Sequence, residues 1–74
     1  MPQLEVNVRA MRTRLKMTQA EFSMRFRINP HTLRDWESGR YPPTGPARVL
    51  LLVIDGAPDA VLGVLDQTPP LQVA

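Results

Sequence analysis

The sequence contains no cysteine among its 74 residues, so neither a disulfide framework nor a cysteine-based zinc site can form. Its longest uninterrupted apolar run, Val49–Ile54, is far shorter than the roughly 20 residues that cross a bilayer as a helix. The opening stretch MPQLEVNVRA lacks the apolar segment of a signal peptide. These absences predict a cytoplasmic protein that does not enter a membrane.

Residue patterns typical of enzymes are also missing. The chain has one histidine, His31, and no nucleophile motif, phosphate-binding glycine loop or metal-ligand spacing. A chain of this size buries only about 60–65% of its unfolded surface, which leaves little room for a buried pocket. The sequence therefore predicts a single small domain that is not an enzyme and holds no cofactor or metal.

The charges are unevenly distributed along the chain. Residues 1–40 contain eight basic and four acidic residues, a net charge of +4, whereas residues 41–74 contain one basic and three acidic residues, a net charge of −2. This asymmetry favours a basic half that meets a polyanion. The alternative is a solvated basic surface, which is common on small domains.

Capping signals divide the chain into short helices. Thr18 with Glu21 three residues later is a capping box, and Asn29 followed by Pro30 is a typical helix start. No stretch has the sustained alternation of a β-strand, so the predicted fold class is all-α, a compact domain of five helices. The expected helices are residues 7–16, 18–26, 29–38, 46–55 and 58–65, within a domain spanning residues 1–66, followed by an extended or flexible tail over residues 67–74.

The second and third expected helices are separated only by Arg27 and Ile28, a spacing that predicts a helix-turn-helix over residues 18–39. Leu33 and Trp36 give the third helix an apolar back. Its front is polar, and a helix of this kind suits insertion into the major groove of DNA. The front consists of His31, Arg34, Asp35 and Ser38.

The run RTRLKMTQAEFSMRFRINPHTLRDWESGR resembles the Cro/CI-type (XRE) helix-turn-helix family of DNA-binding domains. The continuation LRDWESGRYPPTGPARVLLLVI is similar to HigA-type antitoxins of bacterial toxin–antitoxin modules, in which a W-E-x-G-R run precedes a G-P-A helix. The resemblance extends over about Val8–Ile54. It implies a homodimeric transcriptional repressor that binds a specific double-stranded operator and autoregulates a toxin–antitoxin operon.

The resemblance also implies which side chains contact DNA. Gln19 matches the glutamine that grips a backbone phosphate and braces the reading helix. Arg34 is placed for phosphate contact or for bidentate recognition of guanine, and Asp35 either accepts from cytosine N4 or orients a neighbour. The predicted DNA-binding residues are Gln19, Asn29, Pro30, His31, Arg34, Asp35 and Arg40.

Arg27 departs from the family pattern, which often has glycine at this turn. A left-handed backbone at this position costs an arginine about 1 kcal/mol. The basic residues of the first expected helix either flank the DNA backbone or form a solvated face: Arg9, Arg12, Arg14 and Lys16.

The expected helix over residues 46–55 is apolar on most of its circumference, more than one core-facing side requires. The surplus predicts a dimer interface, because a repressor of this type needs a two-fold axis to bind two half-sites. The alternative is that these residues close the monomer core. The predicted interface residues are Leu51, Ile54, Val61, Leu62 and Leu65.

Two other functions remain open at the level of sequence. One is neutralisation of a HigB/RelE-type toxin by direct binding, for which residues 1–6 and 66–74 are the only segments outside the helix-turn-helix and apolar helices. The other is a stand-alone, phage-like regulator without a toxin. The expected partners are therefore operator DNA, a second copy of the chain and a HigB/RelE-type toxin.

Overall fold

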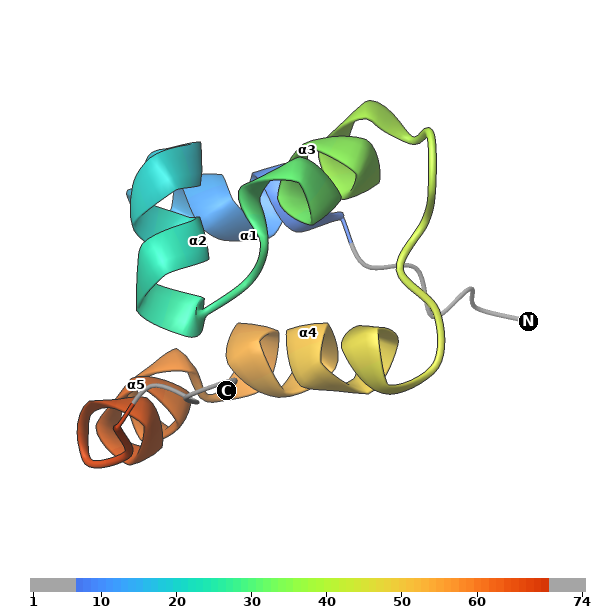
Figure 1. Cartoon of the computed structure of the whole chain (residues 1–74). Coiled ribbons are helices and arrows are strands. Elements are labelled where there is room, and N and C mark those ends of the chain that lie inside the picture. The colour runs from blue at the N-terminus through green and yellow to red at the C-terminus, as the bar shows by residue number, and fades with distance from the viewer. Residues whose placement is uncertain (1–6, 70–74) are drawn as a thin grey trace.

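The computed structural model describes residues 7–69, which form five helices joined by short connections (Figure 1). This confirms the all-α, five-helix architecture. Residues 1–6 and residues 70–74 of the predicted tail lie outside the described part of the chain. Within residues 7–69, no helix is long and apolar enough to cross a membrane. The helices are α1 (Val8–Arg14), α2 (Gln19–Phe26), α3 (Pro30–Ser38), α4 (Pro46–Gly56) and α5 (Pro58–Asp66).

Side chains cap the first three helices, and those of α2 and α3 are the predicted Thr18 and Asn29. The Asn7 side chain caps α1. At the start of α2 the capping box is complete: Glu21 N–H donates to Thr18 Oγ1 at 3.1 Å and Thr18 N–H donates to Glu21 Oε1 at 2.8 Å. At the start of α3, Asn29 Oδ1 accepts from the backbone N–H of His31 at 2.8 Å. These side chains satisfy N–H groups that no helical carbonyl can reach.

Two helix ends differ from the prediction. The first helix ends at Arg14 rather than near residue 16, because Lys16 adopts a left-handed backbone with φ 59°. The fourth helix ends at Gly56, one residue beyond the expected end at residue 55, because the following Ala57 has a φ of −147°, which is not helical.

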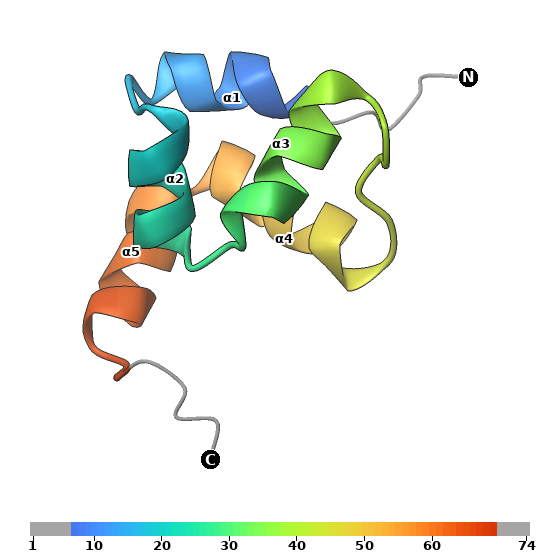
Figure 2. The same cartoon turned by 45° about the horizontal axis from the view of Figure 1, so that its top comes forward.

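The five helices enclose one core. Helix α3 packs against α1 and α2, and α5 packs against α2 and α4. Figures 1 and 2 show α4 on the opposite side of the core from α3, with the connection over residues 39–45 running between them. The domain therefore has a side formed by α3 and a separate side formed by α4.

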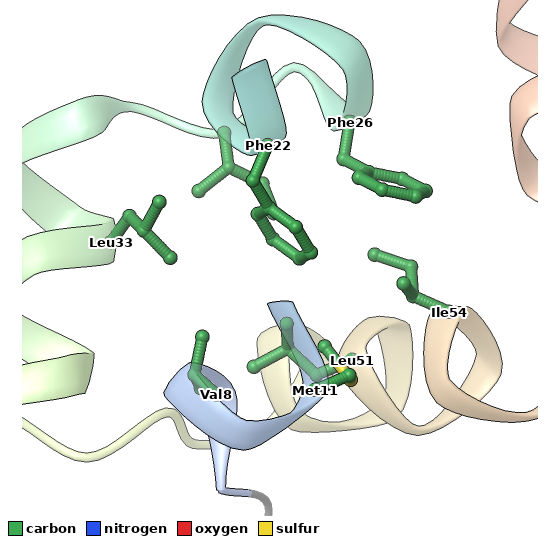
Figure 3. Packing of buried hydrophobic residues seen from close by; sticks show 8 residues of the cluster. Val8, Met11, Phe22, Phe26, Leu33, Leu51 and Ile54 are labelled. Carbon is green, nitrogen blue, oxygen red and sulfur yellow. The ribbon is translucent and has the colours of Figure 1, made fainter. Parts of the chain in front are cut away.

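The core consists of apolar side chains from α1 to α4 that point toward one another (Figure 3). The rings of Phe22 and Phe26 lie 4.8 Å apart between centroids, at a tilt of 44°, an arrangement typical of favourable aromatic pairs. Trp36 is half-buried and packs against the edge of the core. The buried residues are Val8, Met11, Phe22, Phe26, Ile28, Leu33, Leu51 and Ile54.

Leu51 and Ile54 were predicted to lie at a dimer interface, and for these two residues the prediction is wrong. Both side chains are completely buried within the single chain, so neither presents surface to a partner. The helix phase explains this result, because residues three apart on α4 share the face that turns toward the core.

Arg27 has the left-handed backbone conformation that the sequence analysis considered unfavourable for an arginine, with φ 57° and ψ 45°. Its guanidinium reaches α5: Nη2 donates to the carbonyl oxygens of Leu65 and Thr68, each at 2.6 Å. A cation at a helix C-terminus interacts favourably with the exposed carbonyls there. The side chain therefore offsets part of the backbone strain and ties the α2–α3 turn to the end of α5.

Lys16 and Arg27 share a backbone conformation but differ in side-chain contacts, which allows a matched comparison. We expect Lys16→Gly to raise the free energy of unfolding by about 0.5–1 kcal/mol, because glycine removes the left-handed strain and no described contact is lost. Arg27→Gly also removes the left-handed strain but loses the hydrogen bonds to α5. Its free energy of unfolding should therefore rise by less than that of Lys16→Gly, or fall. Chemical denaturation measures both. Equal stabilisation by the two variants would contradict a role for the Arg27 contacts.

Candidate functional site

The exposed side of α3 carries polar side chains, as predicted. Leu33 is completely buried, whereas His31, Arg34 and Ser38 are exposed and Asp35 is half-buried. This arrangement follows from the 3.6-residue period of a helix whose apolar side packs into the core. Helix α3 therefore presents a continuous polar face to the outside.

The opposite edge of α3 is anchored by a residue that the sequence analysis did not single out. The side chain of Glu37 is only 2% exposed. Its carboxylate accepts two hydrogen bonds from Arg12, from Nε at 2.7 Å and from Nη2 at 2.9 Å. The remaining guanidinium nitrogen, Arg12 Nη1, donates to the carbonyl of Met17 at 2.9 Å. A planar, two-point contact of this kind fixes orientation as well as distance.

The electrostatics of Glu37 follow from this contact. The hydrogen bonds from Arg12 hold the pKa of the Glu37 carboxyl below its ordinary value, and the bond from Gln19 adds to the effect against the opposing influence of burial. The same contact raises the pKa of Arg12. Both groups are therefore charged at neutral pH, and the carboxylate is neutralised within the protein.

Gln19 lies at the first position of α2 and joins the same network. Its Nε2 donates to Glu37 Oε1 at 3.1 Å. A glutamine amide has two N–H groups, and the second one makes no hydrogen bond to any residue in the described range 7–69. Gln19 is thus hydrogen-bonded to Glu37 of α3, and its predicted contact with a DNA phosphate stays a prediction.

On the exposed face, His31 and Arg34 are in direct contact. Arg34 Nη2 lies 2.8 Å from His31 Nδ1. The sequence analysis left open whether Asp35 orients these side chains; no hydrogen bond or ion pair of the Asp35 carboxylate is present among residues 7–69. It is His31 that contacts Arg34, and the Asp35 carboxylate is left as an acceptor.

Asn29 and Pro30 lie at the N-terminal end of α3, and both are exposed. The Asn29 Oδ1 accepts from the backbone N–H groups of His31 and Thr32, the latter at 3.4 Å. Only the Nδ2 amide of Asn29 remains for an outside partner. Pro30 has no side-chain polar atom and offers apolar contact only.

Arg40 follows the left-handed Gly39 at the end of α3. Its guanidinium carbon lies 5.7 Å from the centre of the Tyr41 ring, within the range of a cation–π contact. Both side chains are exposed. The structure thus places Arg40 at the C-terminal end of the polar face, separate from the His31–Arg34 pair.

The basic residues of α1 do not form a uniform face. Arg12 is committed to Glu37, and Arg14 pairs with Asp55 of α4. Arg9 is largely exposed, with Nε 3.6 Å from Glu37. The interpretation of Arg12 as part of a solvated or DNA-flanking face is therefore wrong, because its guanidinium is turned inward.

A second exposed feature lies on α4, away from α3. Several apolar side chains there remain accessible although Leu51 and Ile54 of the same helix are buried. Val61, Leu62 and Leu65 of α5, predicted for the dimer interface, are half-buried and pack against the core. The exposed apolar residues of the two helices are Val49, Leu50, Leu52, Val53 and Val64.

In a comparison with known protein families, a family model described as Helix-turn-helix matches residues 8–47, more than half of the chain. The matched region contains α1, α2, α3 and the start of α4. No curated protein and no solved structure is significantly similar to the chain.

The Glu37 contact gives a prediction for stability. We expect Glu37→Gln to lower the free energy of unfolding by about 2–3 kcal/mol, somewhat less than the loss typical of breaking a fully buried pair, because Arg12 keeps access to solvent. Since the folded-state pKa of Glu37 is lowered, its contribution is present above the ordinary carboxyl pKa of about 4.3 and is lost as the pH falls through the lower folded value. Denaturation from pH 7 down to acid should therefore show a smaller fall for Glu37→Gln than for the wild type.

The matched control is Asp55→Asn, which breaks the exposed pair with Arg14. Surface pairs of this kind contribute about 0–1 kcal/mol, so this variant should stay close to the wild type. Glu37→Gln and Asp55→Asn of equal stability at pH 7 would contradict the anchoring role of Glu37.

Proposed function

The chain belongs to the helix-turn-helix family, and from this membership we propose that it is a homodimeric transcriptional repressor that reads its operator with α3. Sequence-specific DNA binding, DNA as a partner, and the absence of enzymatic activity follow from the family itself. The finer assignments are that α3 is the reading helix, that two copies act together in the cytoplasm, and that the operator belongs to a toxin–antitoxin operon.

The observation that carries the proposal is the division of α3 into an anchored edge and a polar front. Glu37 and Leu33 hold the helix to α1, α2 and the core, while His31 and Arg34 project from the exposed side. The major groove admits one helix and displays donors and acceptors on the base edges. A rigidly held helix with hydrogen-bonding groups on its free side fits that groove.

Phosphate contacts supply the rest of the interface in this proposal. Gln19 has one amide N–H left beyond its bond to Glu37, at the N-terminus of α2, where the helix dipole favours an anion. Arg40, at the far end of α3, contributes a full positive charge. Contacts of this type position a protein on DNA without reading its sequence.

The test is selection from a randomised duplex library, followed by fluorescence anisotropy with the selected duplex at several salt concentrations. Enrichment of a palindrome whose half-sites lie about ten base pairs apart supports a dimeric repressor. If no sequence is enriched and binding depends only on salt, the polar face of α3 is merely a charged surface, and the proposal fails.

The two arginines of this face should behave differently. We expect Arg34→Ala to relax the preference at one base position, by about 1–3 kcal/mol of discrimination if the contact is bidentate. Arg40→Ala should weaken binding to every sequence and reduce the slope of log affinity against log salt by about one. Arg14→Ala is the charge-matched control, because Asp55 already neutralises that side chain. Loss of affinity in both variants without any change in preferred sequence would contradict the assignment of Arg34.

For the dimer we propose the exposed apolar residues of α4 and α5, flanked by the half-buried Val61, Leu62 and Leu65. Helix α4 is apolar beyond the side that faces the core: Leu52 is 41% and Val53 48% exposed. Apolar side chains gathered on one helix surface are typical of contact sites with other proteins. A second copy is the occupant that a two-fold operator requires.

We expect the double variant Leu52→Asp, Val53→Asp to fold as a monomer, because both side chains lie outside the core. Its affinity for the palindromic operator should fall about 100-fold or more, since each half-site must then be bound separately. Light scattering measures the mass, and Met24→Asp is the control, because Met24 is an exposed apolar residue on α2, 71% accessible. A double variant that remains dimeric would show that this surface is not the interface.

For the biological setting we propose autoregulation of an operon that encodes a HigB/RelE-type toxin, with this chain as the antitoxin. The support is the resemblance of LRDWESGR and GPARVLLLVI to HigA-type antitoxins; a phage-like regulator without a toxin is the alternative. Co-expression with the product of the neighbouring gene distinguishes the two. Rescue of growth and co-purification support the antitoxin role, whereas a neighbour that is harmless and does not bind supports the alternative.

A further inference from the structure

The contact between His31 and Arg34 fixes the roles of the imidazole nitrogens. A guanidinium has five N–H donors and no acceptor, so His31 Nδ1, which lies 2.8 Å from Arg34 Nη2, must accept that hydrogen bond. A protonated imidazole has no acceptor left for such a contact. With Nδ1 as the acceptor, the N–H donor of the ring is at Nε2.

From this geometry we propose that His31 has two separate roles in reading the operator: its Nδ1 positions Arg34 for a guanine, and its Nε2–H donates to a neighbouring base. The inference rests on the proposed function of α3 as the reading helix. It assigns to the histidine a positioning role toward another side chain, in addition to a base contact of its own.

The other polar groups of the face are not equivalent to this pair. Bidentate recognition of adenine by asparagine needs a free carbonyl oxygen, and Asn29 Oδ1 already accepts two backbone N–H groups. Glu37 is committed to Arg12. Asp35 supplies an acceptor only. Among these side chains of the α3 face, the strong donors are therefore concentrated at His31 and Arg34.

The spacing of the pair fits neighbouring base pairs. Residues three apart on a helix are separated by about 4.5 Å along its axis, and successive base pairs by about 3.4 Å. Arg34 keeps enough N–H groups to bind N7 and O6 of a guanine. The Nε2–H of His31 finds an acceptor on the major-groove edge of guanine, adenine or thymine, but not on cytosine, which displays only its N4 amino donor.

The experiment uses the selected operator and the full chain, with 7-deazaguanine replacing the guanine assigned to Arg34. This base pairs normally but lacks the N7 acceptor. In the wild type the replacement should lower affinity about tenfold, and in Arg34→Ala it should have no effect. In His31→Ala the penalty should fall to about twofold, because Arg34 is no longer held in place. The double variant His31→Ala, Arg34→Ala should show no penalty from 7-deazaguanine, as Arg34→Ala alone.

Two conservative variants separate the roles. An asparagine carbonyl reaches the position of Nδ1, so His31→Asn should restore the tenfold penalty of 7-deazaguanine. A glutamine amide reaches the position of Nε2. His31→Gln should therefore still bind more weakly when cytosine is placed at the neighbouring base position, as the wild type does. A merely structural role of His31 does not predict this split. Circular dichroism and affinity for unrelated DNA at low salt verify that each variant is folded.

The outcomes distinguish the inference from the function on which it rests. If an operator is selected and Arg34→Ala abolishes the 7-deazaguanine penalty, but His31→Ala leaves it at about tenfold, the positioning role is overturned and the repressor proposal stands. If His31→Asn fails to restore the penalty that His31→Ala removed, acceptance by Nδ1 is overturned. If no duplex is enriched at all, both proposals fail.

Discussion

The buried carboxylate of Glu37 is the contact on which the orientation of α3 depends. It joins the helix to Arg12 of α1 and to Gln19 of α2, and Arg12 also holds the carbonyl of Met17 in the turn between those helices. Desolvating an ion pair is expensive, so such a pair contributes less to stability than its close distances suggest. Its main effect is geometric, because only one rotation of α3 about its axis satisfies both oxygens. A helix that reads base edges needs that restriction, since a small rotation would move every side chain on its free side.

The turn between α2 and α3 shows a different balance of local and distant interactions. Arg27 adopts a conformation suited to glycine, yet its side chain donates to carbonyl oxygens at the end of the neighbouring α5. A glycine at this position would relax the backbone and leave α5 attached only through its apolar contacts with α2 and α4. The short α5, which has no fully buried side chain, thus gains a polar attachment to the helix-turn-helix.

Local signals were readable from the sequence, and distant pairings were not. The caps at Thr18 and Asn29, the left-handed Gly39 and the apolar back of α3 follow from residues a few positions apart. The bond between Arg12 and Glu37 joins residues 25 positions apart, and nothing in the local pattern of either residue marks the other. Likewise, the composition of α4 indicated more apolar side chains than one core-facing side needs. The packing then shows that Leu51 and Ile54 are buried in the core, while Leu52 and Val53 are exposed. The contact of His31 with Arg34 lies within reach of sequence reasoning, being three residues along one helix face, but its direction depends on side-chain rotamers.

On α3, some residues hold the helix to the domain and others lie on its exposed face. This division bears on how a regulator of this kind can diverge after gene duplication. Substitutions at residues 31, 34 and 35 change groups outside the core and outside the Glu37 network. If α3 is the reading helix, as proposed, a duplicated copy can therefore acquire a new operator without loss of the fold. The proposed dimer surface on α4 is not altered by those substitutions, so, if two copies pair through α4, the duplicated chains would exchange subunits. Mixed dimers would then recognise hybrid, non-palindromic sites. In the proposed dimer, two regulators built on this scaffold would therefore stay separate only after changes on α4 as well as on α3.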